Sequence, residues 1–241
     1  MYRIGIDVGS SFTKYCVMID GEIRELFEEK TPIRQIEYFE AKTRELLAKY
    51  PKAEIVSCGY GRSNVSGIRN INELTALAKG AYWSSGEDGL ILDVGGQDSK
   101  LIYQKQGKLR EFFVNDKCAA GSGLFLSSVL DMIGIGFDEV ELLIDENKAS
   151  GLSSTCAVFA QSEIVEMIAD NCSEGEIVSS VLHQIFVKAK QLLVKAEGEP
   201  LLLTGGLSQI EGIGGFAEKI LGRKCIVGDY GAYLASIGCA I

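Results

Sequence analysis

Two aspartates at the ends of short apolar runs are well placed in this sequence to do chemistry. Asp7 lies in the segment IDVGSSFTK and Asp93 in the segment LDVGGQDSK, and in each the aspartate precedes a glycine-containing bend. Backbone N–H groups at such a bend can approach phosphate oxygens closely, and a carboxylate at the strand end can hold Mg²⁺ or its waters. The two segments therefore predict a site for a nucleotide with Mg²⁺.

The two segments belong to a longer internal repeat. Residues 6–23 and 92–109 align without gaps at a constant offset of 86, so that Asp7 matches Asp93 and Lys14 matches Lys100. A register kept over this length indicates two similar lobes. The alternative is a pair of ordinary β-hairpins whose aspartates are solvated or cap a turn, and the shared register favours the duplicated phosphate site.

A third glycine signal lies at residues 201–208, which read LLLTGGLS. The leucines predict a short buried strand, and Gly205-Gly206 opens the backbone just beyond it. Because glycine has no Cβ, a nucleoside can lie flat against the chain at Gly206. Alone this is a common strand-to-helix turn, but after two phosphate hairpins it is the expected adenosine contact.

Two of the seven cysteines differ from the rest by the sequence around them. Cys118 lies in VNDKCAAGSG and Cys156 in SSTCAVF, and an apolar helical run follows each. Helix N-termini lower the pKa of a thiol, so both positions favour a thiolate or an anionic cluster. The other five cysteines lie in patterns typical of packing thiols, and the alternative for this pair is two unrelated buried thiols.

Two thiolates complete neither a tetrahedral zinc site nor a four-iron cluster, and the chain has no C-x₂-C series. Four ligands would be available if two chains met about a twofold axis, each contributing Cys118 and Cys156. The cysteines therefore raise the hypothesis of a cluster shared between two subunits.

Strands and helices in alternation must position these groups. Each repeat follows a strand–bend–strand–turn–strand pattern, and Asp20-Gly21 forms the turn of the first copy, because this pair tolerates the positive φ of a tight hairpin. Residues 35–50 and 176–196 carry apolar residues at helical spacing, and residues 54–58 form a further strand pattern.

The composition excludes several classes of function. Of 241 residues, 46% are hydrophobic and 24% charged, with a net charge of −9, so nothing favours unspecific binding to nucleic acid or to an anionic membrane. The single histidine, His183, excludes a His-cluster metal site. No apolar stretch reaches the roughly 20 residues of a membrane span and no signal peptide is visible. We expect a soluble cytoplasmic protein.

The ordered glycine signals resemble those of the actin, sugar kinase and Hsp70 ATPase superfamily. This resemblance implies an α/β fold with two ribonuclease-H-like lobes and a nucleotide cleft between them. The first lobe is expected at residues 1–85 and the second, with the two cysteines, at residues 86–229. A C-terminal helix at residues 230–241 is expected to pack back on the first lobe.

Four segments, NDKCAAGSG, SSTCAVFAQSE, DVGGQDSK and GYGR, resemble more narrowly the ATPase family that activates 2-hydroxyacyl-CoA dehydratases and benzoyl-CoA reductases. The resemblance implies a homodimer holding one [4Fe–4S] cluster through cysteines that match Cys118 and Cys156. It further implies that the dimer binds ATP or ADP with Mg²⁺ and passes one electron to a partner iron–sulfur dehydratase or reductase. A ferredoxin- or flavodoxin-like donor would reduce it.

The candidate site residues divide by role. Asp7 and Asp93 would hold Mg²⁺ through water, and Gln97 or Asp98 would position the hydrolytic water. The phosphates would meet Gly9, Ser10, Ser11, Thr13, Lys14, Gly95, Gly96, Gln97 and Lys100. The nucleoside would meet Gly205, Gly206 and Ser208.

Two other functions remain open from the sequence. A small-molecule kinase of the same fold would use the same phosphate loops with an aspartate as base, but it would need no particular cysteine. A nucleotide-dependent regulatory or assembly module would likewise need neither cysteine.

Overall fold

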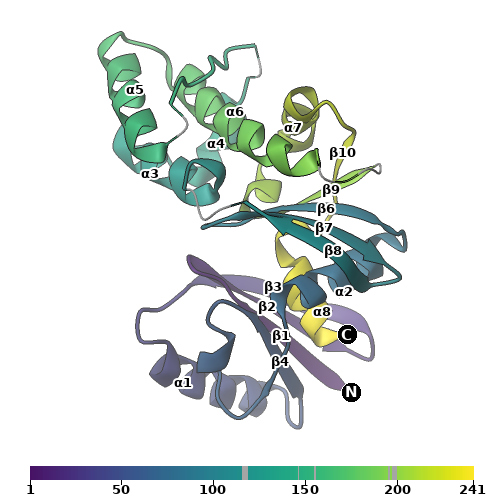
Figure 1. The fold of residues 1–241 in the computed structure, drawn as a ribbon. Coiled ribbons are helices and arrows are strands. Elements are labelled where there is room, and N and C mark those ends of the chain that lie inside the picture. The colour runs from purple at the N-terminus through teal and green to yellow at the C-terminus, as the bar shows by residue number, and fades with distance from the viewer. Residues whose placement is uncertain (116–118, 146, 155, 195, 197–199) are drawn as a thin grey trace. The chain divides into compact units, whose positions relative to one another are not determined.

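The computed structural model describes residues 1–115, 119–145, 147–154, 156–194, 196 and 200–241. The chain divides into two compact units (Figure 1). The first unit comprises residues 1–88, 103–111 and 233–241, and the second comprises residues 89–102 and 112–232.

The first unit is built on a sheet with the strand order β3-β2-β1-β4-β5. Its strands are β1 (Tyr2–Val8), β2 (Phe12–Ile19), β3 (Glu22–Lys30), β4 (Glu54–Gly59) and β5 (Arg69–Asn70). Strands β1 and β2 are antiparallel, whereas β4 lies parallel to β1 on its other side. The β2–β3 turn has φ of 52° at Asp20 and 91° at Gly21, which is the left-handed backbone predicted from the Asp-Gly pair.

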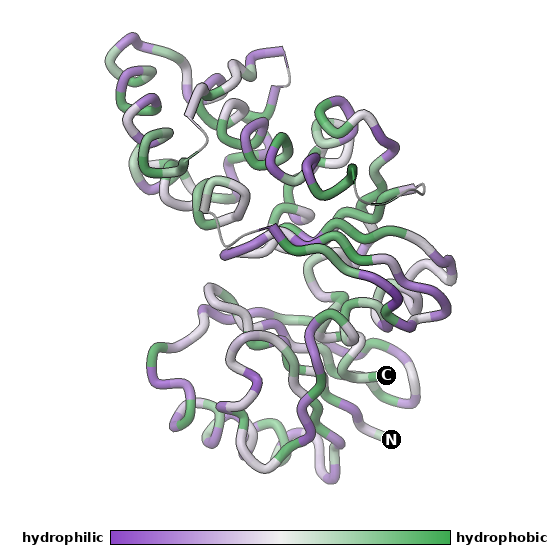
Figure 2. The backbone as a smooth tube through the Cα atoms, viewed as in Figure 1, coloured by the Kyte–Doolittle hydropathy of each residue, from purple (hydrophilic) through white to green (hydrophobic). Residues whose placement is uncertain are grey.

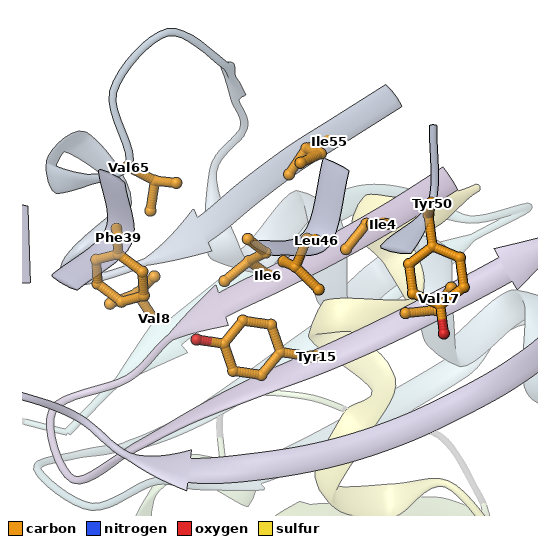
Figure 3. Close-up of a cluster of buried hydrophobic side chains, with 10 residues drawn as sticks. All are labelled: Ile4, Ile6, Val8, Tyr15, Val17, Phe39, Leu46, Tyr50, Ile55 and Val65. Atoms are coloured by element: carbon orange, nitrogen blue, oxygen red, sulfur yellow. The ribbon is translucent and has the colours of Figure 1, made fainter. Parts of the chain in front are cut away.

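Helix α1 (Gln35–Lys49) buries an apolar stripe on one face of this sheet. Phe39 and Leu46 of α1 pack with Ile4 and Ile6 of β1 and with Tyr15 of β2 in a core of buried side chains, as Figure 3 shows. Of the apolar residues at helical spacing, Phe39 and Leu46 thus form the inward face, whereas Ile36 and Leu47 are exposed.

Helices α2 (Glu73–Ser85) and α8 (Leu234–Ala240) approach each other closely, and α8 also packs on β1, β2 and β4. A Cβ at Gly80 of α2 would lie 1.8 Å from the carbonyl oxygen of Leu234, and one at Gly238 of α8 would lie 1.7 Å from that of Ala76. Only glycine fits at these two crossing points, because the helix backbones are in direct contact.

The second unit holds a sheet with the strand order β10-β9-β6-β7-β8. Its strands are β6 (Gly89–Val94), β7 (Ser99–Lys105), β8 (Lys108–Val114), β9 (Leu201–Gly205) and β10 (Cys225–Val227). The parallel strands β6 and β9 are mostly hydrophobic (Figure 2), with apolar runs at residues 90–92 and 201–203, as expected of strands covered on both faces. A polar residue follows each run, Asp93 in β6 and Thr204 in β9. The end of β7 and the beginning of β8, which lie within residues 103–111, belong to the first compact unit.

The helices of the second unit are α3 (Gly123–Ile133), α4 (Val140–Leu143), α5 (Ala157–Ala169), α6 (Glu174–Leu193) and α7 (Ile213–Leu221). Helices α3, α4 and α7 pack against α6, whereas α5 packs against α3. Three short 3₁₀ turns of the described residues also lie in this unit: η2 (Ala119–Gly121), η3 (Phe137–Glu139) and η4 (Gly206–Gln209). The turn η1 (Arg62–Asn64) belongs to the first unit, and η5 (Gly231–Tyr233) includes residues of both units. Helix α6 begins two residues before its predicted start, because Ser173 and Glu176 form a capping box.

In the part of the chain that the structure describes, no helix combines the length and the apolar character needed to span a membrane.

Candidate functional site

Each unit places one of the repeated aspartates beside a glycine at the end of a parallel strand. In the first unit Asp7 lies opposite Cys58 and Val8 opposite Gly59. In the second unit Asp93 lies opposite Thr204 and Val94 opposite Gly205. The duplication therefore extends beyond the hairpins to the parallel strands β4 and β9.

Gly59 and Gly205 are required by the backbone. Their φ angles are 90° and 91°, a region that side chains disfavour. A Cβ at Gly59 would lie 2.7 Å from Oδ1 of Asp7, and one at Gly205 would lie 3.0 Å from Oδ1 of Asp93. Both glycines thus leave room for the aspartate carboxylate. The sequence contains Gly59 within the GYGR segment, but its equivalence to Gly205 follows only from the strand register.

We define the second hairpin as β6, β7 and the bend between them, residues 95–98. Its charged groups form a buried cluster, in which Nζ of Lys100 lies 2.9 Å from Oδ1 of Asp98 and 3.3 Å from Oδ2 of Asp93. The three side chains are 5–11% exposed. Buried charges need such partners, since desolvation otherwise disfavours them. Lys100, predicted to neutralise phosphate, neutralises two carboxylates in this structure.

The bend of the second hairpin is tied to the start of α3. Gly95 N–H donates to the carbonyl of Asp98 at 2.9 Å and closes the bend. The carbonyls of Gly95 and Gly96 accept the N–H groups of Gly123 and Leu124 at 2.8 and 3.1 Å. Gln97 is exposed at the tip of the bend. The bend is thus held in place from the side of α3.

Ser99 and Asn115 form a second set of contacts behind this bend. The N–H of Ser99 donates to Oδ1 of Asn115 at 2.9 Å, and the N–H of Asn115 donates to the carbonyl of Ser99 at 3.0 Å. The Ser99 hydroxyl donates to the carbonyl of Gly121. Ser99 is not among the predicted site residues, although its match to Thr13 in the repeat is a signal for a role at the site.

The first hairpin is β1, β2 and the bend between them, residues 9–11, and its polar groups are arranged differently. The buried Thr13 hydroxyl lies 3.0 Å from that of Thr31, which donates to the carbonyl of Gly9 at 2.9 Å. In the bend Ser10 is exposed and Ser11 half-buried, and Lys14 on β2 is half-buried too. Thr31, which the sequence analysis missed, joins the hairpin from the end of β3.

Cys58 contacts the aspartate of the first hairpin, with Sγ at 3.5 Å from Oδ1 of Asp7. Burial, together with Cys239 and Asp7, raises the pKa of the Cys58 thiol well above its ordinary value. It therefore stays protonated and can donate to the carboxylate.

The segment predicted to contact the nucleoside follows β9 directly. Gly205 ends the strand, and Gly206 begins η4. Ser208 donates its hydroxyl to the carbonyl of Gly205 at 2.7 Å. A Cβ at Gly206 would meet nothing within 4 Å, so open space lies beside the backbone there.

The structure thus gathers the candidate nucleotide residues into one group in each unit. The first unit holds Asp7, Gly9, Ser10, Ser11, Thr13 and Lys14 around its bend. The second unit holds Asp93, Gly95, Gly96, Gln97, Asp98 and Lys100, with Gly205, Gly206 and Ser208 following the neighbouring strand. Carboxylate oxygens such as those of Asp7 and Asp93 are the donors that Mg²⁺ takes in proteins.

Cys156 is the N-cap residue of α5 and is exposed, so the predicted helix start at this cysteine is confirmed. The other cysteine of the pair, Cys118, lies outside the described residues. An exposed thiol at a helix N-terminus suits an anionic metal cluster, because the peptide dipoles favour negative charge there.

The chain before Cys156 is anchored from two helices. The carboxylate of Glu163 in α5 accepts the N–H groups of Ser153 and Ser154, each at 2.7 Å. Hydrogen bonds from Ser154 and Ser153 lower the pKa of Glu163 to about 2. On the other side, Nε2 of Gln184 in α6 donates to the carbonyl of Ser154 at 3.1 Å. Neither anchor is evident from the sequence.

Among the residues that the structure describes, no three His, Cys, Asp or Glu side chains are grouped so as to hold a metal ion. A cluster on Cys156 would therefore need ligands beyond these residues. The predicted sources of these ligands are Cys118 and a second copy of the chain.

Two α/β units, each with an aspartate and a glycine-containing bend in one repeated frame, define a two-lobed nucleotide-binding protein. The chain belongs to the BadF/BadG/BcrA/BcrD ATPase family, whose model matches residues 4–241.

Individual relatives agree with this membership. The 2-hydroxyisocaproyl-CoA dehydratase activator of Clostridioides difficile is 32% identical over 253 residues, covering 100% of this chain and 94% of the relative. A structure of the activator of the 2-hydroxyisocaproyl-CoA dehydratase from Clostridium difficile with bound ADPNP has a TM-score of 0.87 at 29% identity, covering 100% of this chain and 93% of that one.

The fold is shared more widely. A glucokinase of the ROK family from Streptomyces griseus has a TM-score of 0.61 at 14% identity, covering 100% of this chain and 98% of that one. At this identity the match shows the fold alone, and it confirms the predicted actin/sugar kinase architecture.

Proposed function

We propose that this protein is an ATP-dependent activator that passes one low-potential electron to a partner iron–sulfur enzyme. The partner would be of the 2-hydroxyacyl-CoA dehydratase or benzoyl-CoA reductase type. The observation that carries the proposal is the exposed thiol of Cys156 at the N-cap of α5 in a chain of this ATPase family. The relatives named as dehydratase activators support the same function.

The two hairpins would hold ATP and then ADP by their bends, with the nucleoside at Gly205, Gly206 and Ser208. Asp7 and Asp93 would bind Mg²⁺ through water, and Gln97 or Asp98 would orient the hydrolytic water. Binding of Mg²⁺ beside Asp93 would compete with Lys100, whose Nζ lies 3.3 Å from Oδ2 of Asp93. Lys100 and Lys14 would then be available to the phosphates.

Cys118 and Cys156 of two subunits would together hold one [4Fe–4S] cluster, with Cys156 placed by the N-terminus of α5. When bound, the cluster supplies a one-electron redox centre of low potential. The two subunits would form a homodimer, reduced by a ferredoxin- or flavodoxin-like donor in a reducing cytoplasm, where thiols persist.

Anaerobic purification with iron and sulfide quantitation, together with the EPR spectrum after dithionite reduction, tests this function. We expect about four irons per dimer, lost in Cys118→Ser and in Cys156→Ser. Cys172→Ser, which changes a half-buried cysteine elsewhere in the second unit, is the matched control and should retain the iron. An iron-free wild-type protein with intact ATPase activity would contradict the redox function and favour a kinase or a regulatory ATPase.

A further inference from the structure

We propose that Ser99 and Asn115 are positioning residues that couple a nucleotide on the second hairpin to the chain segment containing Cys118. The proposal deepens the function proposed above and rests on the nucleotide site that it assigns to this hairpin. It is argued from contacts within the second unit alone.

On the N-terminal side of this segment, Asn115 is fixed to the hairpin by a reciprocal pair of hydrogen bonds. Its Oδ1 accepts the N–H of Ser99 at 2.9 Å, and its own N–H donates to the Ser99 carbonyl at 3.0 Å. Ser99 is fully buried, so water cannot readily replace these bonds. The end of β8 is therefore held to the start of β7.

On the C-terminal side, the chain returns to the same hairpin. The carbonyl of Gly121 accepts the Ser99 hydroxyl. Two residues further on, Gly123 donates its N–H to the carbonyl of Gly95 at 2.8 Å. Residues 115 and 121, which flank the segment on either side, are thus both bonded to Ser99.

These hydrogen bonds can transmit a conformational change, because they connect the start of α3 directly to the predicted phosphate-binding bend. Gly95 and Gly96 provide the carbonyls that accept from the start of α3. The N–H of Gly95 closes the bend on the carbonyl of Asp98 at 2.9 Å, and the N–H of Gly96 belongs to the same bend, which is predicted to face phosphate. If phosphate binding turns these peptide groups, the start of α3 must follow or its hydrogen bonds must break. Packed, hydrogen-bonded elements of this kind shift between discrete arrangements.

The first hairpin is anchored at the matching residue by different contacts. Thr13, which matches Ser99 in the repeat, pairs with Thr31 at 3.0 Å, and the N–H of Thr31 donates to the carbonyl of Ser11 at 2.9 Å. There the anchored chain leads to α1, which has no cysteine. Each unit thus ties its hairpin to the chain that follows it through the matched residue, Thr13 or Ser99, and only in the second unit does that chain contain one of the paired cysteines.

Thiol alkylation of the iron-free protein tests the proposal. The rates at which iodoacetamide modifies Cys118 and Cys156 are measured by mass spectrometry, with and without saturating Mg-ADP. In the wild type we expect nucleotide to change the Cys118 rate by about fivefold or more, the lower end of ordinary coupling between sites. In Ser99→Ala and Asn115→Ala this change should fall below about twofold, while the Cys156 rate responds as in the wild type.

Two further variants separate coupling from a general loss of structure. Ser127→Ala removes a hydroxyl that donates to the carbonyl of Gly123 at 3.1 Å within α3, without touching the hairpin, and should keep the full nucleotide effect. Asn115→Asp keeps an oxygen acceptor for the Ser99 N–H and should restore most of it. Calorimetric titration checks that each variant binds Mg-ADP.

An unchanged nucleotide effect in Ser99→Ala and Asn115→Ala would overturn the proposal, and so would a wild type whose Cys118 rate ignores bound nucleotide. Loss of Mg-ADP binding in these variants would overturn it too, because it would assign Ser99 and Asn115 to binding. The experiment needs no cluster. Failure of the redox function, seen as absence of iron, is therefore distinguishable from failure of the coupling.

Discussion

The two hairpins share one backbone frame but surround their aspartates with different chemistry. Asp7 lies near the thiol of Cys58, at 3.5 Å, and its bend carries an exposed serine. Asp93 shares the cation of Lys100 with Asp98. The two hairpins thus share the backbone geometry that places a carboxylate beside a glycine. The charged and polar side chains around that carboxylate differ between the two units.

Replacing the two matched lysines should break this comparison most sharply. Lys100→Met would leave the buried carboxylates of Asp93 and Asp98 without their cation and should lower the free energy of unfolding by about 3–5 kcal/mol. Lys14→Met, at the half-buried matching position, should change it by no more than about 0.5 kcal/mol. Urea unfolding measures both. Equal effects would show that the two hairpins are electrostatically alike.

Replacing the two matched glycines should show where the hairpins agree. Gly59→Ala and Gly205→Ala each force a side chain into a φ near 90° and against a carbonyl, 2.4 Å from Val8 O and 2.2 Å from Val94 O. Each should cost about 1–3 kcal/mol of unfolding free energy. Gly206→Ala, where a Cβ meets nothing within 4 Å, is the control and should cost less than about 0.5 kcal/mol. A large loss in only one of the pair would contradict the shared frame.

The smallest effect concerns an anchor that belongs only to the cysteine-bearing unit. The pKa of Glu163, about 2 when folded, lies below its ordinary 4.5, so its hydrogen bonds stabilise the folded state fully above about pH 4.5. This stabilisation is lost as the pH falls toward 2. The stability difference between wild type and Glu163→Gln should therefore shrink between pH 5 and pH 2.5, as followed by urea unfolding. A difference that stays constant over this range would rule out the anchor.

The sequence could predict the parts of this fold that depend on neighbouring residues. The repeat predicted both bends, the Asp20-Gly21 turn has its positive φ, and the apolar run after Cys156 is a helix that begins at Ala157. The capping box of Ser173 and Glu176 was readable as S-x-x-E but was missed, which placed the start of α6 two residues late.

The contacts that could not be predicted join residues that are distant in the sequence and that meet only when the strands pair. Ser99 meets Asn115 across 16 positions and Gly121 across 22, and Gly59 becomes the counterpart of Gly205 only when β4 and β9 pair with their neighbours. Lys100 could not be assigned to its two carboxylates either. Its position along β7 was known, but the direction of its side chain follows from packing.

The close contact of α8 with α2 has a consequence for biosynthesis. The first unit begins at residue 1 yet needs residues 233–241, including Gly238 against the backbone of Ala76. Domains fold as units while the chain emerges from the ribosome, so this unit cannot finish folding until translation has passed residue 240. All residues of the second unit are made earlier. The unit translated first is thus completed last, and until then it leaves the sheet face that α8 covers without its partner.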